Sequence, residues 1–145
     1  MASEGHGQHS LTLESSLASA GKGSEWARTL AARSGLPEER VGALDLCIVE
    51  LVSNVVMHSY RGAPGEIRLD LALDDVGAML TVTDSGPPFD PLSAPAPTVP
   101  ASLEEAKIGG YGIHLVRSSA DACLYRRRDG RNIFIACFGS TPPSP

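Results

Sequence analysis

The sequence lacks the excess of basic charge that marks many nucleic-acid-binding proteins. Its 145 residues include 12 lysines and arginines against 17 aspartates and glutamates, which gives a formal net charge of −5. A nucleic-acid-binding domain normally carries a basic stripe, so this balance argues against direct nucleic-acid binding. The nearest candidate is the run 126–128 with Arg131, which flanks an Asp-Gly pair and is more typical of a solvated hairpin tip.

Cysteines and apolar runs are also scarce. The three cysteines, Cys47, Cys123 and Cys137, show no CxxC spacing and stand in apolar stretches, which predicts buried thiols of a reducing compartment. The first residues contain no apolar core of a signal peptide, and no stretch approaches the apolar length that spans a bilayer. We therefore expect a cytoplasmic protein with no membrane partner.

A chain of this length is expected to form one domain with one core. We place the domain at residues 9–139, with flexible termini at 1–8 and 140–145. The interior shows no repeat and no linker. About twenty irregular residues follow Asp84 and hold six of the 11 prolines, and a loop this long inside a compact domain is typical of a lid or binding loop.

The hydrophobic periodicity predicts an α+β fold. Alternation predicts strands over 9–17, 66–73, 78–84, 122–128 and 132–138, and helical spacing predicts helices over 24–34, 38–60 and 112–120. In the first strand Leu11, Leu13 and Leu17 are expected on one side. The second strand should point Ile67, Leu69, Leu71 and Leu73 inward, and Asp129-Gly130 should form the last tight turn. This order predicts a two-layer α/β sandwich, with a mixed, mostly antiparallel sheet covered by helices on one face.

The first candidate for chemistry is an acid and an amide in the most apolar helix. Glu50 and Asn54 are spaced i, i+4 and so share a face, with His58 one turn further on. The oxygen of Asn54 suits a hard cation such as Mg²⁺, and Glu50 could accept a proton from a hydroxyl or water. Alternatively, neighbouring backbone groups satisfy both side chains.

Two further motifs contain glycines. Asp84-Ser-Gly86 ends a strand, where a carboxylate can accept a hydrogen bond from an exocyclic amine such as that of adenine. Gly109-Gly110-Tyr111-Gly112 precedes a helix whose N-terminus can bind phosphate. Taken singly, the first is a common turn and the second is a weak signal. The chain has no P-loop, and Leu115 stands where a dinucleotide fold needs its third glycine.

The order and spacing of the three motifs resemble the GHKL (gyrase, Hsp90, histidine kinase, MutL) ATPase superfamily, or Bergerat fold. The nearest resemblance is to its bacterial anti-sigma-factor serine kinase branch, the partner-switching kinases. Glu50-x3-Asn54-x3-His58-x-Tyr60 resembles the N box, and the stretch from Asp84 to Pro91 resembles the first glycine box. The stretch from Gly109 to Arg117 resembles the second glycine box. The resemblance covers about residues 9 to 138.

The resemblance implies ATP and Mg²⁺ as cofactors and a role for each matching residue. Asn54 would bind Mg²⁺ and ATP, Glu50 would be the catalytic base for a serine hydroxyl, and Asp84 would hold the adenine amine beside Gly86. Residues 90–108 would form the ATP lid, in which Lys107 would reach a phosphate. The remaining ATP-binding residues would be Gly109, Gly110, Tyr111 and Gly112.

The chain also departs from the family pattern in two places. Pro88 stands where the wider superfamily has a second glycine, although Pro-Pro-Phe-Asp is familiar within the kinase branch. The last hairpin has Gly130-Arg-Asn132 where many relatives have a Gly-Thr-Thr type of segment near the adenine. The edge of the pocket that receives the base is therefore expected to be lined differently.

The leading hypothesis is an ATP-dependent protein serine kinase that acts as an anti-sigma factor. It would phosphorylate an anti-sigma-factor antagonist, sequester a sigma factor and form a homodimer, as the resemblance implies. The alternative is a partner-switch module that binds ATP without kinase activity, and Glu50 argues against it because such a module needs no base. The catalytic part of a sensor histidine kinase fits less well, since no helix pair with a phosphoacceptor histidine is present.

Overall fold

The computed structural model describes residues 6–93 and 111–140, and within them the chain forms a five-stranded sheet in the order β1-β2-β3-β5-β4. All four strand pairs are antiparallel, where a mixed, mostly antiparallel sheet was expected. The strands are β1 (Gly7–Glu14), β2 (Glu66–Leu73), β3 (Ala78–Asp84), β4 (Ala122–Arg128) and β5 (Arg131–Phe138).

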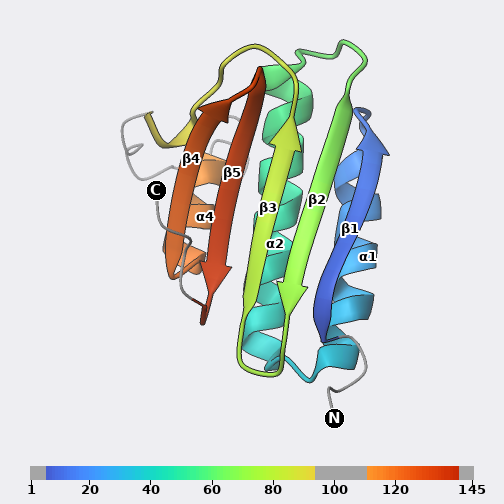
Figure 1. The fold of residues 1–145 in the computed structure, drawn as a ribbon, viewed down its shortest axis with the longest axis vertical. Coiled ribbons are helices and arrows are strands. Elements are labelled where there is room, and N and C mark those ends of the chain that lie inside the picture. Colours follow the sequence, from blue (N-terminus) through green and yellow to red (C-terminus); the bar gives the residue numbers. More distant parts are fainter. Residues whose placement is uncertain (1–5, 94–110, 141–145) are drawn as a thin grey trace.

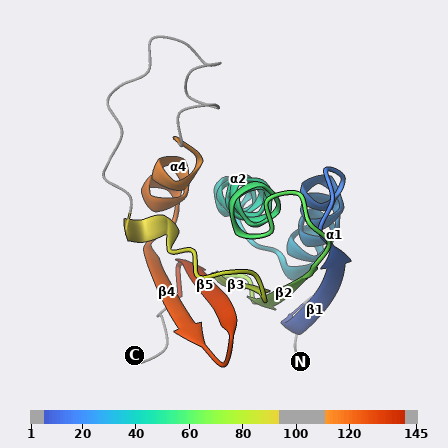
Figure 2. The ribbon, with the colours of Figure 1, turned by 90° about the horizontal axis from the view of Figure 1, so that it is seen from above.

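In the described part of the chain, three α-helices cover one face of this sheet, and Figure 2 shows them in a single layer above the strands. They are α1 (Ser19–Ser34), α2 (Glu38–Asn54) and α4 (Tyr111–Ser119). A short π-helix, η1 (Val55–Ser59), extends α2, and a single 3₁₀ turn, η2 (Pro91–Ser93), follows β3. The predicted α+β, two-layer architecture is confirmed (Figure 1).

The core lies between the sheet and the central helix α2. The alternation predicted for β2 is confirmed, because Ile67 and Leu69 are fully buried while Arg68 is exposed. From the helix side, Ile48 and Val52 of α2 are also fully buried. Side chains at alternate strand positions therefore pack under the helices, as a sheet with one covered face requires.

The first strand is shorter than expected. Leu17 was predicted to continue its apolar side, but β1 ends at Glu14 and the Leu17 side chain is 95% exposed. The reason is a polar turn: Ser19 Oγ donates to the carbonyl of Glu14 (2.5 Å) and accepts from the amide of Ser16 (2.9 Å). These bonds end the strand and place Ser19 at the start of α1, five residues before the helix start predicted at Ser24.

Helix α2 and η1 together form 22 continuous helical residues, Glu38–Ser59, with a mean hydropathy of 1.6 in the most apolar window. This is long and apolar enough to cross a membrane by length and composition, so the expectation that no stretch approaches such a length is wrong. The core helix of a globular domain can pass the same criterion. Here Leu44, Ile48 and Val52 are buried among the residues that form the core with the sheet.

The three cysteines are free thiols in the folded chain. Burial raises the pKa of Cys47 to about 12, with smaller contributions from the nearby Cys123 and Glu50. Burial also raises the pKa of Cys123 to about 11, and it raises the pKa of Cys137 above the usual value of a thiol. All three thiols therefore stay protonated at neutral pH, and the thiolate is the reactive form of cysteine.

We expect iodoacetamide to label Cys47 far more slowly in the folded protein than in urea, at about pH 8, because the buried thiol does not ionise there. Mass spectrometry of peptides after timed alkylation measures the rates. The same reaction in urea, where all three thiols are exposed, is the control. Equal labelling rates of Cys47 in the two conditions would contradict the assignment.

A core substitution and a surface substitution of the same type test the packing. Leu69→Ala should lower the free energy of unfolding by about 2–5 kcal/mol, because it leaves a cavity in the core between the sheet and the helices. Leu17→Ala should change it by no more than about 0.5 kcal/mol, because that side chain is exposed. Urea unfolding followed by circular dichroism measures both. Similar losses for the two variants would refute the placement of Leu17 outside the strand.

Candidate nucleotide site

The predicted site residues lie on elements that meet at one end of the sheet. Figure 1 shows the C-terminal end of α2, the end of β3 and the β4–β5 hairpin together at the top of the view. Glu50 and Asn54 come from α2, Asp84 ends β3, and Gly112 lies in the first turn of α4. Three predicted residues, Lys107, Gly109 and Gly110, lie outside the described residues, and Tyr111 is described only as the first residue of α4.

A small cavity joins Asn54 of α2 to Asp84 of β3. Its volume is about 20 Å³, enough for about one water molecule. A purine ring needs more room than this cavity offers. The other lining residues are mainly apolar or aromatic: Leu51, Val55, Val82, Phe89, Pro91, Tyr125, Asn132 and Phe134.

The carboxylate of Asp84 is the polar centre of this end of the sheet. Asp84 is only 4% exposed. Its Oδ1 accepts hydrogen bonds from Ser59 Oγ (2.5 Å), the Gly86 amide (2.9 Å) and Asn132 Nδ2 (3.0 Å). A buried acid costs free energy unless it is hydrogen-bonded, and these donors satisfy one of its two oxygens.

Position 86 requires a glycine because the neighbouring atoms leave no room for a Cβ. A Cβ at this position would overlap with Ser59 Oγ, and it would lie 3.1 Å from Asp84 Oδ1. A side chain would therefore push on the pair that holds the carboxylate. This is a steric reason for the glycine, and a turn conformation is not needed to explain it.

Glu50 lies directly against the start of α4. A Cβ on Gly112 would overlap with Oε2 of Glu50. The glycine thus lets the two helices approach at the carboxylate, and it brings the predicted base of the N box against the second glycine box. Both Glu50 and Asn54 are half-buried, so neither is sealed in the core.

Two aromatic residues close the first glycine box onto the end of α2. The ring of Phe89 stacks on His58, with centroids 5.6 Å apart and an angle of 20° between the planes. Tyr60 Oη accepts from the Ser85 amide (2.9 Å) and donates to the carbonyl of Glu66 (2.6 Å). His58 therefore packs on the loop, a role that the sequence left open, while His114 is exposed on α4.

The arginine-rich hairpin also contacts the site. The predicted turn at Asp129-Gly130 is confirmed, since both residues have positive φ angles of 53° and 74°. Arg127 was expected to be solvated, and its side chain does reach the surface, but its Nη1 donates to the carbonyl of Gly86 (2.7 Å). The hairpin thus supports the first glycine box.

Sequence reasoning did not select Asn132 and Tyr125 as site residues. Asn132 lies opposite Asp84 in the β3–β5 pairing and is 5% exposed, and Tyr125 Oη donates to its Oδ1 (2.6 Å). Burial raises the pKa of Tyr125, so its hydroxyl remains a donor at neutral pH. The sequence contained one indication of this role: Asn132 stands in the hairpin segment where many relatives have a Gly-Thr-Thr type of segment near the adenine.

The chemistry of these residues fits a magnesium nucleotide. A buried carboxylate beside apolar walls suits a base with an exocyclic amine, and Asn54 lines the same cavity. Within the described residues, no group of three or more His, Cys, Asp or Glu side chains could hold a metal ion. Mg²⁺ that is bound together with phosphates and water needs few protein oxygens, and Asn54 could supply one of them.

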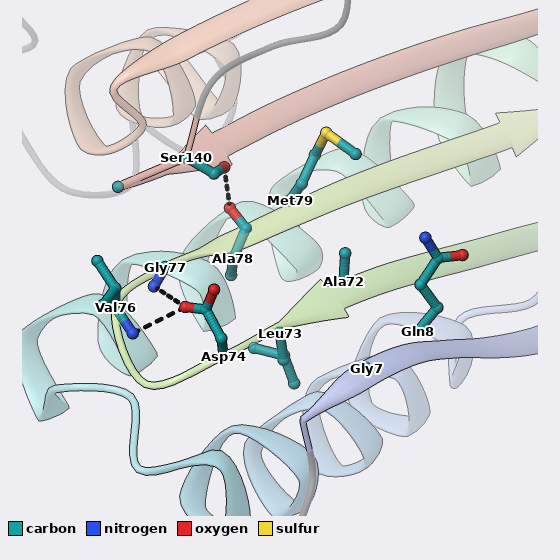
Figure 3. A pocket seen from close by; sticks show the side chains of 11 residues that line it. Gly7, Gln8, Ala72, Leu73, Asp74, Val76, Gly77, Ala78, Met79 and Ser140 are labelled. Carbon is teal, nitrogen blue, oxygen red and sulfur yellow. Dashed lines mark hydrogen bonds between the residues drawn. The ribbon is translucent and has the colours of Figure 1, made fainter. Parts of the chain in front are cut away.

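A wider depression of about 390 Å³ lies at the opposite end of β3, beside the β2–β3 turn (Figure 3). Its lining includes Gln8, Ala72 and Met79. Its one carboxylate is already engaged, because Asp74 Oδ1 accepts from the amides of Val76 and Gly77, each at 2.8 Å. These bonds lower the pKa of Asp74. The depression lacks the convergent polar groups of a catalytic site, and size alone does not make it the functional one.

The profile of the histidine kinase-like ATPase domain matches residues 13–138. The chain is 33% identical over 120 residues to the serine/threonine-protein kinase BtrW of Bordetella bronchiseptica, covering 82% of this chain and 84% of that protein. It is 27% identical over 97 residues to the serine-protein kinase RsbW of Listeria monocytogenes, covering 63% of this chain and 62% of that protein.

A solved structure has the same fold at low sequence identity. It contains the RsbU and RsbW domains of a Mycobacterium tuberculosis protein, and it matches with a TM-score of 0.64 at 17% identity. The match covers 90% of this chain and 31% of that one. At this identity the likeness shows the fold, and the roles of individual residues rest on other arguments.

We expect Gly86→Ala to lower the free energy of unfolding by about 1–3 kcal/mol, because the new Cβ disturbs the buried Ser59–Asp84 hydrogen bond. Gly42→Ala is the matched control. Gly42 lies in α2 with open space around it, so alanine there should be neutral or stabilise the helix by up to about 1 kcal/mol. Urea unfolding compares the two, and a stable Gly86→Ala variant would disprove the steric argument.

Proposed function

Because the chain belongs to the histidine kinase-like ATPase domain family, we propose that it is an ATP-dependent protein serine kinase that acts as an anti-sigma regulatory factor. The kinase activity is supported by two relatives that are named as serine/threonine- and serine-protein kinases. The observation that carries the proposal is the convergence of three motifs. Asn54 and Asp84 line one cavity, and Glu50 lies against Gly112 on the same end of the fold.

Each residue has a distinct role in the proposed reaction. Asp84 accepts a hydrogen bond from the exocyclic amine of the base, and Gly86 leaves room for the groups that hold that carboxylate. Asn54 provides an oxygen for the metal, and the start of α4 offers backbone amides to phosphate oxygens. ATP would supply the γ-phosphoryl group, and Mg²⁺ would neutralise charge on its phosphates.

Glu50 is the proposed general base. The serine hydroxyl of the protein substrate attacks the γ-phosphorus as the bond to the leaving ADP oxygen breaks, and Glu50 takes the hydroxyl proton. The surroundings of Glu50 support this role, because it is half-buried and Gly112 leaves no side chain between its carboxylate and the start of α4. Lys107, Gly109 and Gly110 are proposed to contact the phosphates, as the sequence resemblance implies.

The proposed substrate is a small anti-sigma-factor antagonist, and the proposed second partner is a sigma factor. Phosphorylation of the antagonist would release the kinase to sequester the sigma factor. We also propose a cytoplasmic homodimer that binds neither nucleic acid nor a membrane. The second candidate function, an ATP-binding switch without kinase activity, remains distinguishable because it makes no use of the Glu50 carboxylate.

The test is phosphate transfer from γ-labelled ATP to antagonist proteins captured from the native host. Glu50→Gln should lower the rate by about 10²–10⁴-fold, the usual contribution of a general base, while ATP binding persists. Glu39→Gln is the matched control, since Glu39 is an exposed acid at the other end of α2. Equal labelling by wild type and Glu50→Gln would exclude Glu50 as the base, and no labelling by wild type would favour the switch without kinase activity.

A further inference from the structure

The side-chain amide of Asn132 makes hydrogen bonds at both of its ends. Its Nδ2 donates to Asp84 Oδ1 (3.0 Å) and to the carbonyl of Pro87 (2.9 Å), and it lies 3.2 Å from Ser59 Oγ. Its Oδ1 accepts from the Phe89 amide (3.0 Å) and from Tyr125 Oη (2.6 Å). One buried amide therefore connects β3, β4, η1 and the loop after β3.

These partners fix which way the amide points. A backbone N–H can only donate, so the atom that faces Phe89 has to be the oxygen. A flipped amide would place its NH₂ group against that N–H and its oxygen against the carboxylate of Asp84. The contacts of Asn132 therefore define the orientation of its amide.

The orientation has a consequence for the carboxylate. Asp84 Oδ1 receives Asn132 Nδ2, Ser59 Oγ and the Gly86 amide, so Oδ2 is the oxygen that is left for the amine of a bound base. An ionised carboxylate only accepts hydrogen bonds. At this position it favours a base that presents an amine, as adenine does, over one that presents a carbonyl, as guanine does.

We propose that Asn132 is a positioning residue for base recognition, which holds the Asp84 carboxylate and the Pro87–Phe89 loop in one fixed arrangement. This inference rests on the proposed nucleotide site. Through Phe89 the same amide also sets a wall of the cavity, because that residue lines it and stacks on His58. Asn132 acts through Asp84 and the loop, and it contributes no reacting group.

An amide-to-acid substitution gives the sharpest test. Asn132→Asp keeps the shape of the side chain but places a second carboxylate within hydrogen-bond distance of Asp84. Two like charges at this separation disfavour ionisation of the second acid, so the pKa of the pair rises and one proton is retained until the pH exceeds it. Above that raised pKa the two acids repel. Below it the protonated acid donates to Asp84, and its other oxygen can accept from Phe89.

The expected result is a new pH dependence of ATP binding. The other charged and titratable groups near the amide are Tyr125, Arg127 and Asp90, and His58 lies behind Phe89. Because the variant keeps all of these groups, a new pH dependence would come from the added carboxylate. Calorimetry should show ATP affinity about tenfold to a hundredfold below wild type at high pH. The affinity should recover as the pH falls from about 8.5 to about 5.5, while wild type shows no such recovery.

Two controls separate positioning from general damage to the fold. Gln8→Glu makes the same chemical change at an exposed site near the other end of the sheet and should leave ATP binding at the wild-type level. Asn132→Ser is neutral and too short to reach Asp84 and Phe89 together. It should weaken ATP binding at every pH, and it provides the test if Asn132→Asp does not fold.

Hydrogen exchange without nucleotide gives a readout that is independent of binding. The Phe89 amide should exchange at least about tenfold faster in Asn132→Ser, since its side-chain acceptor is lost, while amides in the middle of β2 should not change. A folded Asn132→Asp protein with wild-type ATP affinity at all pH values, or unchanged exchange at Phe89 in Asn132→Ser, would overturn the inference. Failure of wild type itself to bind ATP would overturn the proposed function, and the exchange result would still show whether Asn132 holds the loop.

Discussion

The geometry of the site depends on the packing of α2 against the middle of the sheet. Leu44, Ile48 and Val52 are buried on that helix, and they fix its rotation about its own axis. Since a helix turns by about 100° per residue, fixing the buried stripe also fixes the directions of Glu50 and Asn54. The acid and the amide are therefore placed by hydrophobic burial, which stabilises the fold whether or not a ligand is bound.

The second constraint is the register of the sheet. Antiparallel pairing puts Asp84 directly opposite Asn132, on the face that the helices cover. A slip of β5 by one residue would move the Asn132 side chain to the uncovered face. Phe134, which pairs with Val82 in the same register, opposes such a slip because its ring would lose its place in the core.

Local patterns predicted the regular elements well. The bounds of β2 and β3 agree to the residue, because each strand alternates cleanly and is bounded by turn residues. The start of α1 was missed because Gly21 and Gly23 disfavour a helix, yet Gly23 lets α1 approach Leu69 and Ile48 closely, where a Cβ would lie 3.0 and 3.1 Å from their side chains.

Part of the grouping of the candidate residues could be predicted. Asn54, Asp84 and Gly112 were selected by motif spacing, and the fold puts Asn54 and Asp84 on one cavity and Gly112 against Glu50. Asn132 was noted only as a departure from relatives, because its contacts come from cross-strand pairing and a distant loop, which no local pattern encodes. The roles of Lys107 and the paired glycines before Tyr111 stay predictions, since those residues lie outside the part of the chain that is described.

The π-helical turn at Val55–Ser59 limits which sequence changes this segment can tolerate during evolution. It is a widened turn, in which the amide of Tyr60 bonds to the carbonyl of Val55 (2.9 Å), five residues back. Ordinary α-helical winding of the same five residues would rotate Ser59 about the helix axis relative to its present position. The widened turn instead places the Ser59 hydroxyl 2.5 Å from Asp84 Oδ1. The segment should accept exchanges of one amino acid for another much more readily than gains or losses of length.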